Sequence, residues 1–230
     1  MLHPWNLSPD KAIALQKELR DRLVLKWDDR PVNSVAGVDV SIKTDTARAA
    51  IAVFRYPDLK PLASVTADVP LTFPYIPGLL SFRESPALLA AWEQLALKPD
   101  LVLVDGQGIA HPRGLGIASH LGLWIARPTI GVAKSRLYGQ AVEPGPNKGD
   151  HTPLTDQHHP PQVIGAVLRT RPGTTPLYIS PGHLIDLARS LQFVLACTTG
   201  YRLPEPTRWA HKVGAGEPLP VDEGQQPRLL

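Results

Sequence analysis

The stretch LVLVDGQGIAHPRGLGIASHLGL, residues 101 to 123, contains the strand around which the rest of the chain is expected to assemble. Leu101 to Val104 are apolar β-formers and predict a buried strand, which ends at the turn pair Asp105-Gly106. In open α/β sheets, ligands bind in the crevice beyond the carboxyl ends of the strands, so an acid at this position is placed for chemistry. The alternative is that Asp105 only opens an Asp-Gly turn.

The segments on either side predict a mixed sheet. Residues 34 to 41 alternate, with Val38 facing one side of a strand and Asp39 the other. Two more predicted strands, 49 to 54 and 62 to 68, follow after short connections that favour an antiparallel meander. Beyond the central strand come a helix-like stretch and a short strand, 115 to 125 and 129 to 132. This order predicts an α/β, ribonuclease H-like fold, in which a central mixed β-sheet is flanked by helices.

The remaining segments complete one domain. Ser8-Pro9-Asp10 predicts a helix start, with Leu15, Leu19 and Leu23 on its apolar face. A second helix is expected to begin at Ser85-Pro86, with Glu84 just before it. The other expectations are an exposed loop at 143 to 161, a hairpin at 163 to 180, a helix from 184 to 195 and an irregular basic segment at 201 to 211. We expect a single domain over residues 1 to 213 and a flexible tail over 214 to 230.

Composition limits the classes of function. A formal charge of +3 is compatible with nucleic acid as a partner, although the signal is weak. The single Cys197 excludes a disulfide framework and any zinc site made of cysteines, and it favours a reducing compartment. The N-terminal residues resemble no signal peptide, and charged or polar residues interrupt the apolar runs. We therefore expect a cytoplasmic monomer with no membrane partner.

Three acids and one lysine are candidates for a catalytic site. Asp39 lies on the first strand, Glu84 precedes a helix and Asp105 ends the central strand. Mg²⁺ prefers oxygen ligands and is typically held by a few carboxylates that leave room for a phosphate. Lys134, which ends the short strand, suits a phosphate as a positive charge. Each residue also has a structural alternative: a polar sheet face for Asp39, the helix dipole for Glu84, a turn for Asp105 and a solvated surface for Lys134.

Several long motifs resemble the endonuclease V family, nucleases that nick DNA beside deaminated purines. The similarity covers nearly the whole chain apart from the loop after Glu143 and the last dozen residues. The segments that carry it are VAGVDVS, FPYIPGLLSFRE, PDLVLVDGQGIAHPRGLGIASHLGL, PTIGVAKSRLYG, SPGH and RLPEPTRWAH.

The resemblance implies roles for particular residues. Asp39, Glu84 and Asp105 match the metal-binding acids of the family, and Lys134 matches its catalytic lysine. The remaining catalytic position, which carries His or Asp in the family, is matched by His211. Tyr75, Ile76 and Pro77 match the wedge that enters the duplex at the lesion, and an aromatic between prolines loses little entropy on insertion. The alternative for this loop is an aromatic turn packed on the core.

The resemblance also implies a pocket for the flipped base. Its lining is matched by Gly78, Leu80, Gly108, Ile117 and Gly131. Tight walls would exclude the exocyclic amine of guanine, and backbone amides exposed at glycines would bind hypoxanthine. The two aliphatic residues would be apolar in a core as well. Positions near the scissile strand are matched by Arg83, His111 and His183, for which contacts to phosphate are expected.

The implied activity is hydrolysis of the second phosphodiester bond 3′ to the damaged base, leaving 3′-hydroxyl and 5′-phosphate ends. The implied cofactor is Mg²⁺, with Mn²⁺ as a substitute, and the implied partner is DNA containing deoxyinosine. A second hypothesis is an endoribonuclease that cuts at inosine in RNA, because the residues do not reveal the response to a 2′-OH. A third is a binding module without activity, which the presence of all three acids and Lys134 disfavours.

Overall fold

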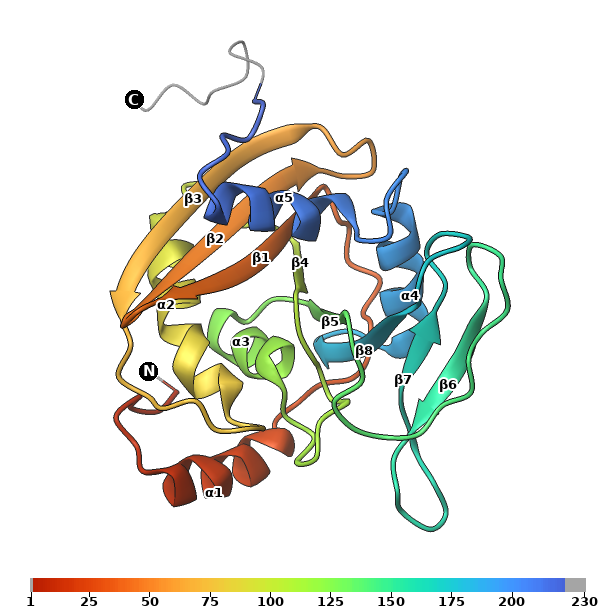
Figure 1. The fold of residues 1–230 in the computed structure, drawn as a ribbon, viewed down its shortest axis with the longest axis horizontal. Helices are drawn as coiled ribbons and strands as arrows, with labels where there is room; N and C mark the ends of the chain where they lie inside the picture. Colours follow the sequence, from red (N-terminus) through yellow and green to blue (C-terminus); the bar gives the residue numbers. More distant parts are fainter. Residues whose placement is uncertain (1, 222–230) are drawn as a thin grey trace.

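Eight strands form one mixed sheet in the computed structural model, which describes residues 2 to 221 (Figure 1). The strand order is β3-β2-β1-β4-β5-β8-β7-β6, in which β4 pairs in parallel with β1 and with β5 and all other neighbours are antiparallel. The predicted mixed α/β sheet is therefore confirmed. The strands are β1 (Ser34–Lys43), β2 (Thr46–Arg55), β3 (Pro61–Pro70), β4 (Leu101–Val104), β5 (Thr129–Ala133), β6 (His151–Thr155), β7 (Val163–Leu168) and β8 (Leu177–His183).

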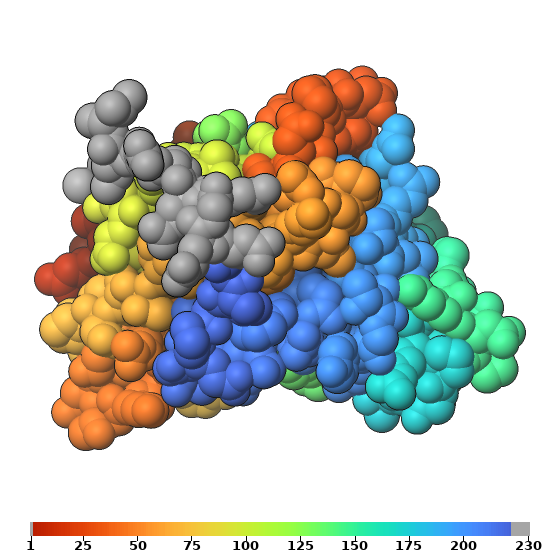
Figure 2. All heavy atoms as spheres, turned by 90° about the horizontal axis from the view of Figure 1, so that it is seen from above, coloured from red at the N-terminus to blue at the C-terminus, as the bar shows by residue number. Residues whose placement is uncertain are grey.

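Helices cover both faces of this sheet (Figure 1). One face carries α2 (Leu80–Gln94) and α3 (Ile117–Ile125), and the other carries α4 (Leu187–Ala196) and α5 (Glu205–Gly214). The first helix, α1 (Pro9–Arg20), begins at the predicted Ser8 cap. Seen from above, the dark blue C-terminal segment lies beside the orange strand segments, and the cyan and green segments form the opposite end of the molecule (Figure 2). None of the helices between residues 2 and 221 is long and apolar enough to cross a bilayer.

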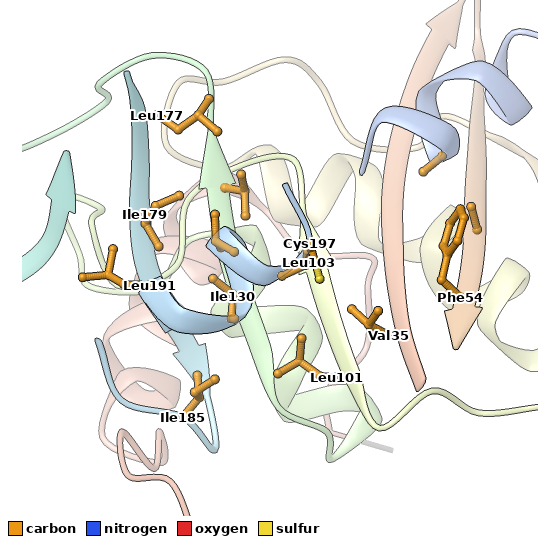
Figure 3. Packing of buried hydrophobic residues seen from close by; sticks show 14 of the residues in the cluster. Val35, Phe54, Leu101, Leu103, Ile130, Leu177, Ile179, Ile185, Leu191 and Cys197 are labelled. Carbon is orange, nitrogen blue, oxygen red and sulfur yellow. The ribbon is translucent and has the colours of Figure 1, made fainter. Parts of the chain in front are cut away.

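The strands divide their side chains between two cores with a period of two. In β4, Leu101 and Leu103 belong to the core under α4 and α5, whereas Val102 and Val104 belong to the core under α2 and α3. Figure 3 shows the first of these cores, which Val35 and Phe54 join from β1 and β2. Burial on both faces explains why the central strand is apolar at every position.

Two predicted helix boundaries were wrong. The second helix begins at Leu80, so Pro86 and Glu84 lie inside α2 instead of at its start. Proline inside a helix removes one hydrogen bond, but Phe82 in the preceding turn is fully buried against Phe73, and this packing holds the turn in place. The fourth helix begins at Leu187, because β8 continues to His183 and the Asp186 carboxylate then caps α4.

Two predicted loops contain regular structure. Residues 143 to 161 include β6, the edge strand of the sheet, where a proline such as Pro153 is tolerated because one edge of the strand needs no partner. Residues 201 to 211 include most of α5, whose first turn contains Pro206, and proline there has the backbone angle that a helix needs. Beyond α5, Leu219 of the predicted tail is buried in the first core, and residues 222 to 230 lie outside the described residues.

A buried pair of histidines joins the N-terminal segment to α2 and α3. His3 Nδ1 lies 2.8 Å from the carbonyl of Pro4, so it carries a proton. His3 Nε2 then accepts from His120 Nε2 at 2.7 Å and from Trp124 Nε1 at 3.2 Å. His120 Nδ1 in turn accepts from the Ser81 hydroxyl at 2.9 Å. The acceptor role of His3 Nε2 requires a neutral His3, and with His120 also neutral every one of these bonds is made.

We expect this pair to make folding sensitive to acid. Burial and the neighbouring His3 lower the pKa of His120 to about 3. Below pH 6.5 the unfolded chain therefore binds more protons than the folded one, and stability is lost as the pH falls from 6.5 toward 3. His120→Gln, which retains a donor and an acceptor but does not titrate, should reduce the loss in unfolding free energy between pH 7 and pH 4.5 in urea titrations. The exposed His159→Gln is the control, and an equal change of slope in both variants would contradict the assignment.

Candidate active site

Two of the predicted acids lie side by side because of the strand register. Val38 pairs with Val104 at the end of the parallel β1–β4 ladder, and the amide of Asp105 donates to the carbonyl of Val38 at 3.4 Å. Asp39 and Asp105 are the next residues on the two strands. Both follow residues of the α2 and α3 core, so both face the α4 and α5 side of the sheet.

Glu84 approaches the same point from α2, on the other side of the sheet. Burial, together with the negative charges of Asp39 and Asp105, raises the pKa of Glu84 to about 8, and Arg83 opposes this only in part. Burial also raises the pKa of Asp105, although Lys134 opposes the rise. The three acids therefore share one poorly solvated region in which their charges repel one another.

Each strand acid has a basic partner. Lys134 Nζ, at the end of β5, donates to Asp105 Oδ2. His211 Nδ1, on α5, lies 3.0 Å from Asp39 Oδ2. The helix reaches this position because β1 has a glycine two residues before Asp39: a Cβ at Gly37 would collide with the backbone of Pro206. All five predicted catalytic residues are thus brought together by β1, α2, β4, β5 and α5.

The donor set fits a hard divalent cation in its chemistry. Burial and then the charges of Asp39 and Asp105 raise the pKa of Glu84, and a positive charge among these carboxylate oxygens would oppose both effects. Within residues 2 to 221, however, no three His, Cys, Asp or Glu side chains already converge closely enough to enclose a metal. Asp39 and Asp105 instead form their pairs with His211 and Lys134.

A cavity of about 380 Å³ opens beside Asp105 and Lys134. Its wall includes the whole predicted wedge and three of the five predicted pocket residues, namely Tyr75, Ile76, Pro77, Gly78, Leu80 and Ile117. Tyr75 is 70 % exposed, so the alternative of an aromatic turn packed on the core does not apply to this side chain. Ile76 does pack on a small core with Phe73 and Phe82, which holds the base of the loop.

The other two predicted pocket residues do not line this cavity. A Cβ at Gly131 would collide with the amide of Gly108, and a Cβ at Gly108 would collide with the carbonyl of Pro181. These glycines allow the loop after β4 to lie directly on β5 and β8. Their role in the structure is therefore close backbone packing behind the cavity.

The carbonyl of Gly78, between the wedge and α2, accepts three hydrogen bonds. The donors are Gln16 Nε2 at 3.0 Å, His111 Nε2 at 3.0 Å and Arg113 Nη2 at 2.6 Å. Burial and the charge of Arg113 lower the pKa of His111 to about 4, so its imidazole is neutral. His111 Nδ1 accepts from the amide of Arg113, which leaves the proton on Nε2 for Gly78. His111 thus positions the loop; it is largely buried but still lines the cavity beside Asp105, and its expected phosphate contact stays a prediction.

Arg83 and His183 also make internal contacts. Arg83 Nη1 donates to the carbonyl of Phe73 at 2.6 Å, and His183 Nδ1 accepts from the amide of Val24 at 3.3 Å. Neither residue lines the cavity beside Asp105. The expected phosphate contacts of these two residues thus stay a prediction.

Sequence reasoning missed several residues at the site. Leu15, Leu19 and Leu23 were expected to form the apolar face of α1. The buried face of this helix is instead Ala12, Gln16 and Leu19, and Leu23 lies beyond its end. The sequence contains a signal for this face, because Gln16 lies four residues after Ala12 and three before Leu19, a spacing that places all three on one side of a helix. Arg113 and Arg202 lie in the quoted motifs without an expected role. Arg202 donates to the carbonyls of Lys134 and Pro176, and so holds the end of β5 against the start of β8.

Comparisons with known proteins identify one family. The family model described as Endonuclease V matches residues 17–212. The chain is 51 % identical over 216 residues to an endonuclease V of Trichormus variabilis, with 93 % of this chain and 96 % of the relative covered. It is 46 % identical over 210 residues to an endonuclease V of Methanothrix thermoacetophila, covering 91 % of this chain and 92 % of the relative.

Solved structures show the same architecture. The endonuclease V of Streptomyces avermitilis is 40 % identical, with a TM-score of 0.87 over 92 % of this chain and 93 % of that one. An endonuclease V of Ciona intestinalis, solved with a 24mer DNA containing an inosine followed by a ribo-adenosine, is 27 % identical. Its TM-score is 0.78 over 90 % of this chain and 96 % of that one. The ribonuclease H-like α/β fold predicted from the element order is thus confirmed.

Proposed function

The chain belongs to the endonuclease V family, and we propose that it repairs DNA by cutting the strand near a deaminated purine. As a member of this family it is a nuclease that acts on phosphodiester bonds. The proposed substrate is DNA containing deoxyinosine, and the proposed cut is at the second phosphodiester bond 3′ to the lesion. The observation that carries the proposal is the cavity whose wall includes both an exposed aromatic wedge and the Asp105–Lys134 pair.

The wedge and the cavity supply recognition. Tyr75 projects from a loop whose C-terminal end is held by three hydrogen bonds to the carbonyl of Gly78. The loop is therefore already ordered, and it loses little conformational entropy when Tyr75 enters the base stack. The extruded base would enter the cavity between the wedge and Ile117. The proposed cut requires a nucleotide held there to have its 3′ side directed toward Asp105 and Lys134.

Asp39, Glu84 and Asp105 are the residues proposed to hold Mg²⁺, with Mn²⁺ as a substitute. When bound, such a cation lowers the pKa of a water and stabilises a departing oxyanion. Lys134 would place its positive charge against the scissile phosphate, and Asp105 keeps its ammonium group in position. His211 orients Asp39 through the hydrogen bond between them. Attack of water on phosphorus with loss of the 3′-oxygen leaves 3′-hydroxyl and 5′-phosphate ends.

Strand cleavage of matched oligonucleotides tests this proposal. One substrate contains a single deoxyinosine in DNA, a second contains a single inosine in RNA, and a third is undamaged DNA. We expect a nick in the first that requires Mg²⁺, is abolished by EDTA and can be resealed by a DNA ligase, which requires the proposed end groups. Faster cleavage of the RNA would instead support the alternative endoribonuclease. No cleavage of either inosine substrate would refute the proposal.

Glu84 is expected to lower the free energy of unfolding, although cleavage requires it. Its carboxyl group has a pKa near 8 in the folded chain and near 4.5 in the unfolded chain, so stability falls as the pH rises from 4.5 to 8. In EDTA at pH 7, Glu84→Gln should therefore raise the free energy of unfolding by about 1 to 3 kcal/mol while cleavage is lost. Urea titrations measure the first effect. Glu93→Gln, on the exposed side of the same helix, should change neither.

A further inference from the structure

A second cleft lies on the other side of the segment that carries Lys134. It has a volume of about 480 Å³, and it shares Lys134, Ser135 and Arg136 with the cavity beside Asp105. Its remaining wall comes from β7, β8 and the segments around residues 142 and 202, none of which borders that cavity. Residues 134 to 136 therefore form a ridge between the two hollows.

The charges in this cleft favour an anion. Lys134, Arg136 and Arg202 contribute three positive charges to its wall. The acid in the lining, Glu143, is paired with Arg169, whose Nη2 donates to it at 2.8 Å. Arg136 is exposed and has no hydrogen bond or ion pair with any other residue between 2 and 221.

Arg202 contributes a positive charge next to Lys134, the first residue of the ridge. Its guanidinium donates to the carbonyls of Thr175 at 2.7 Å, Lys134 at 2.9 Å and Pro176 at 3.0 Å. These acceptors are neutral, so they fix the group without cancelling its charge. Burial lowers the pKa of Arg202, and the nearby carboxylate of Asp105 opposes this effect.

Tyr178 adds an aromatic surface to the same wall. It lies on β8, is partly exposed, and its hydroxyl makes no hydrogen bond to the described part of the chain. Nucleic-acid strands are commonly bound where basic groups contact the phosphates and an aromatic ring contacts a base or sugar. The cleft combines both features.

From this arrangement we propose that the cleft binds the nucleic-acid strand on the 3′ side of the cut. The inference rests on the proposed function, in which the damaged base occupies the cavity and the scissile phosphate lies at Asp105 and Lys134. In this arrangement, a strand that leaves this point away from the base crosses the ridge of residues 134 to 136, which borders both hollows. The cationic cleft is the hollow on that side, and Arg136 contacts the first phosphates beyond the cut.

Substrates shortened on one side test the proposal. The first substrate is a deoxyinosine duplex with long arms on both sides of the lesion. In the second, the cleaved strand ends a single nucleotide beyond the proposed cut, so the 3′ arm is missing. In the third, the 5′ arm is shortened by the same number of nucleotides. For Arg136→Ala we expect kcat/KM on the long substrate to fall about tenfold, as for the loss of one charged hydrogen bond. Removal of the 3′ arm should lower kcat/KM of the wild type by a similar factor. On this shortened substrate, Arg136→Ala and the wild type should have equal kcat/KM. Lys60→Ala, at the opposite end of the sheet, is the control for loss of one exposed charge.

The pattern across substrates decides the outcome. An Arg136→Ala defect that persists unchanged without the 3′ arm, or that disappears without the 5′ arm, overturns the assignment. Fluorescence anisotropy of the same oligonucleotides in EDTA gives a second readout, in which only removal of the 3′ arm should abolish the effect of Arg136→Ala on affinity. If the wild type cuts none of the substrates, the proposed function fails, and the binding data still decide whether the cleft holds the 3′ arm.

Discussion

Replacement of Asp105 with Asn is expected to lower strand cleavage by about 10³-fold or more while leaving affinity for deoxyinosine DNA nearly unchanged. Asp105 lines the cavity, lies next to Asp39 in the strand register and accepts a hydrogen bond from the ammonium group of Lys134. The substitution keeps the shape of the side chain but removes its charge. It therefore weakens both the proposed cation site and the placement of Lys134, whereas the wedge and the rest of the cavity wall are unchanged.

Single-turnover cleavage with saturating enzyme measures the chemical step, and anisotropy in EDTA measures binding. Asp68→Asn, on the exposed edge strand β3, removes one carboxylate far from the cavity and should behave as the wild type. Cleavage by Asp105→Asn at more than about a tenth of the wild-type rate would remove Asp105 from the catalytic site. A large loss of binding together with a lower melting temperature would instead indicate a structural role.

Replacement of Tyr75 with Ala is expected to weaken binding of deoxyinosine DNA about 5- to 150-fold, because stacking of an aromatic ring on a base contributes about 1 to 3 kcal/mol. Tyr75 is 70 % exposed and projects beside the cavity, so its removal leaves no hole in a core. The free energy of unfolding should therefore change little. The dependence of cleavage on Mg²⁺ concentration should also stay the same.

Tyr75→Phe distinguishes stacking from hydrogen bonding. It retains the ring and should bind nearly as well as the wild type if the ring acts as a wedge. Binding competition between deoxyinosine and undamaged duplexes gives the specificity of each variant. Equal affinity of the wild type and Tyr75→Ala for the lesion would show that the loop acts only as part of the cavity wall.

The sequence alone identified the architecture and the acids, because both depend on short-range patterns. Alternation along residues 34 to 41 placed Asp39 on the polar face of a strand, and the apolar run at 101 to 104 placed Asp105 at a strand end. The order of the elements then required these strands to be neighbours. The residues of the wedge and of the catalytic set were found from motifs that resemble those of the family.

Other features depended on contacts between distant segments. Residues 201 to 211 were expected to be irregular, yet most of them belong to α5. Packing of Pro206 on Gly37 brings His211 of this helix onto Asp39. Pro86 falsely indicated a helix start, because the buried Phe82 stabilises an additional turn before it. His111 donates to the carbonyl of Gly78, which lies 33 positions away in the chain, and no local pattern predicted this contact.

Local residue patterns determined the strands other than β6 and the positions of Asp39 and Asp105 in this protein, since side-chain alternation and strand ends are properties of a few consecutive residues. The tertiary structure alone decided which side chains bind which partners. A donor such as Gln16 or Arg202 finds its carbonyl only after the sheet and helices have packed, because the free energy of burying a polar group depends on the acceptor that lies beside it.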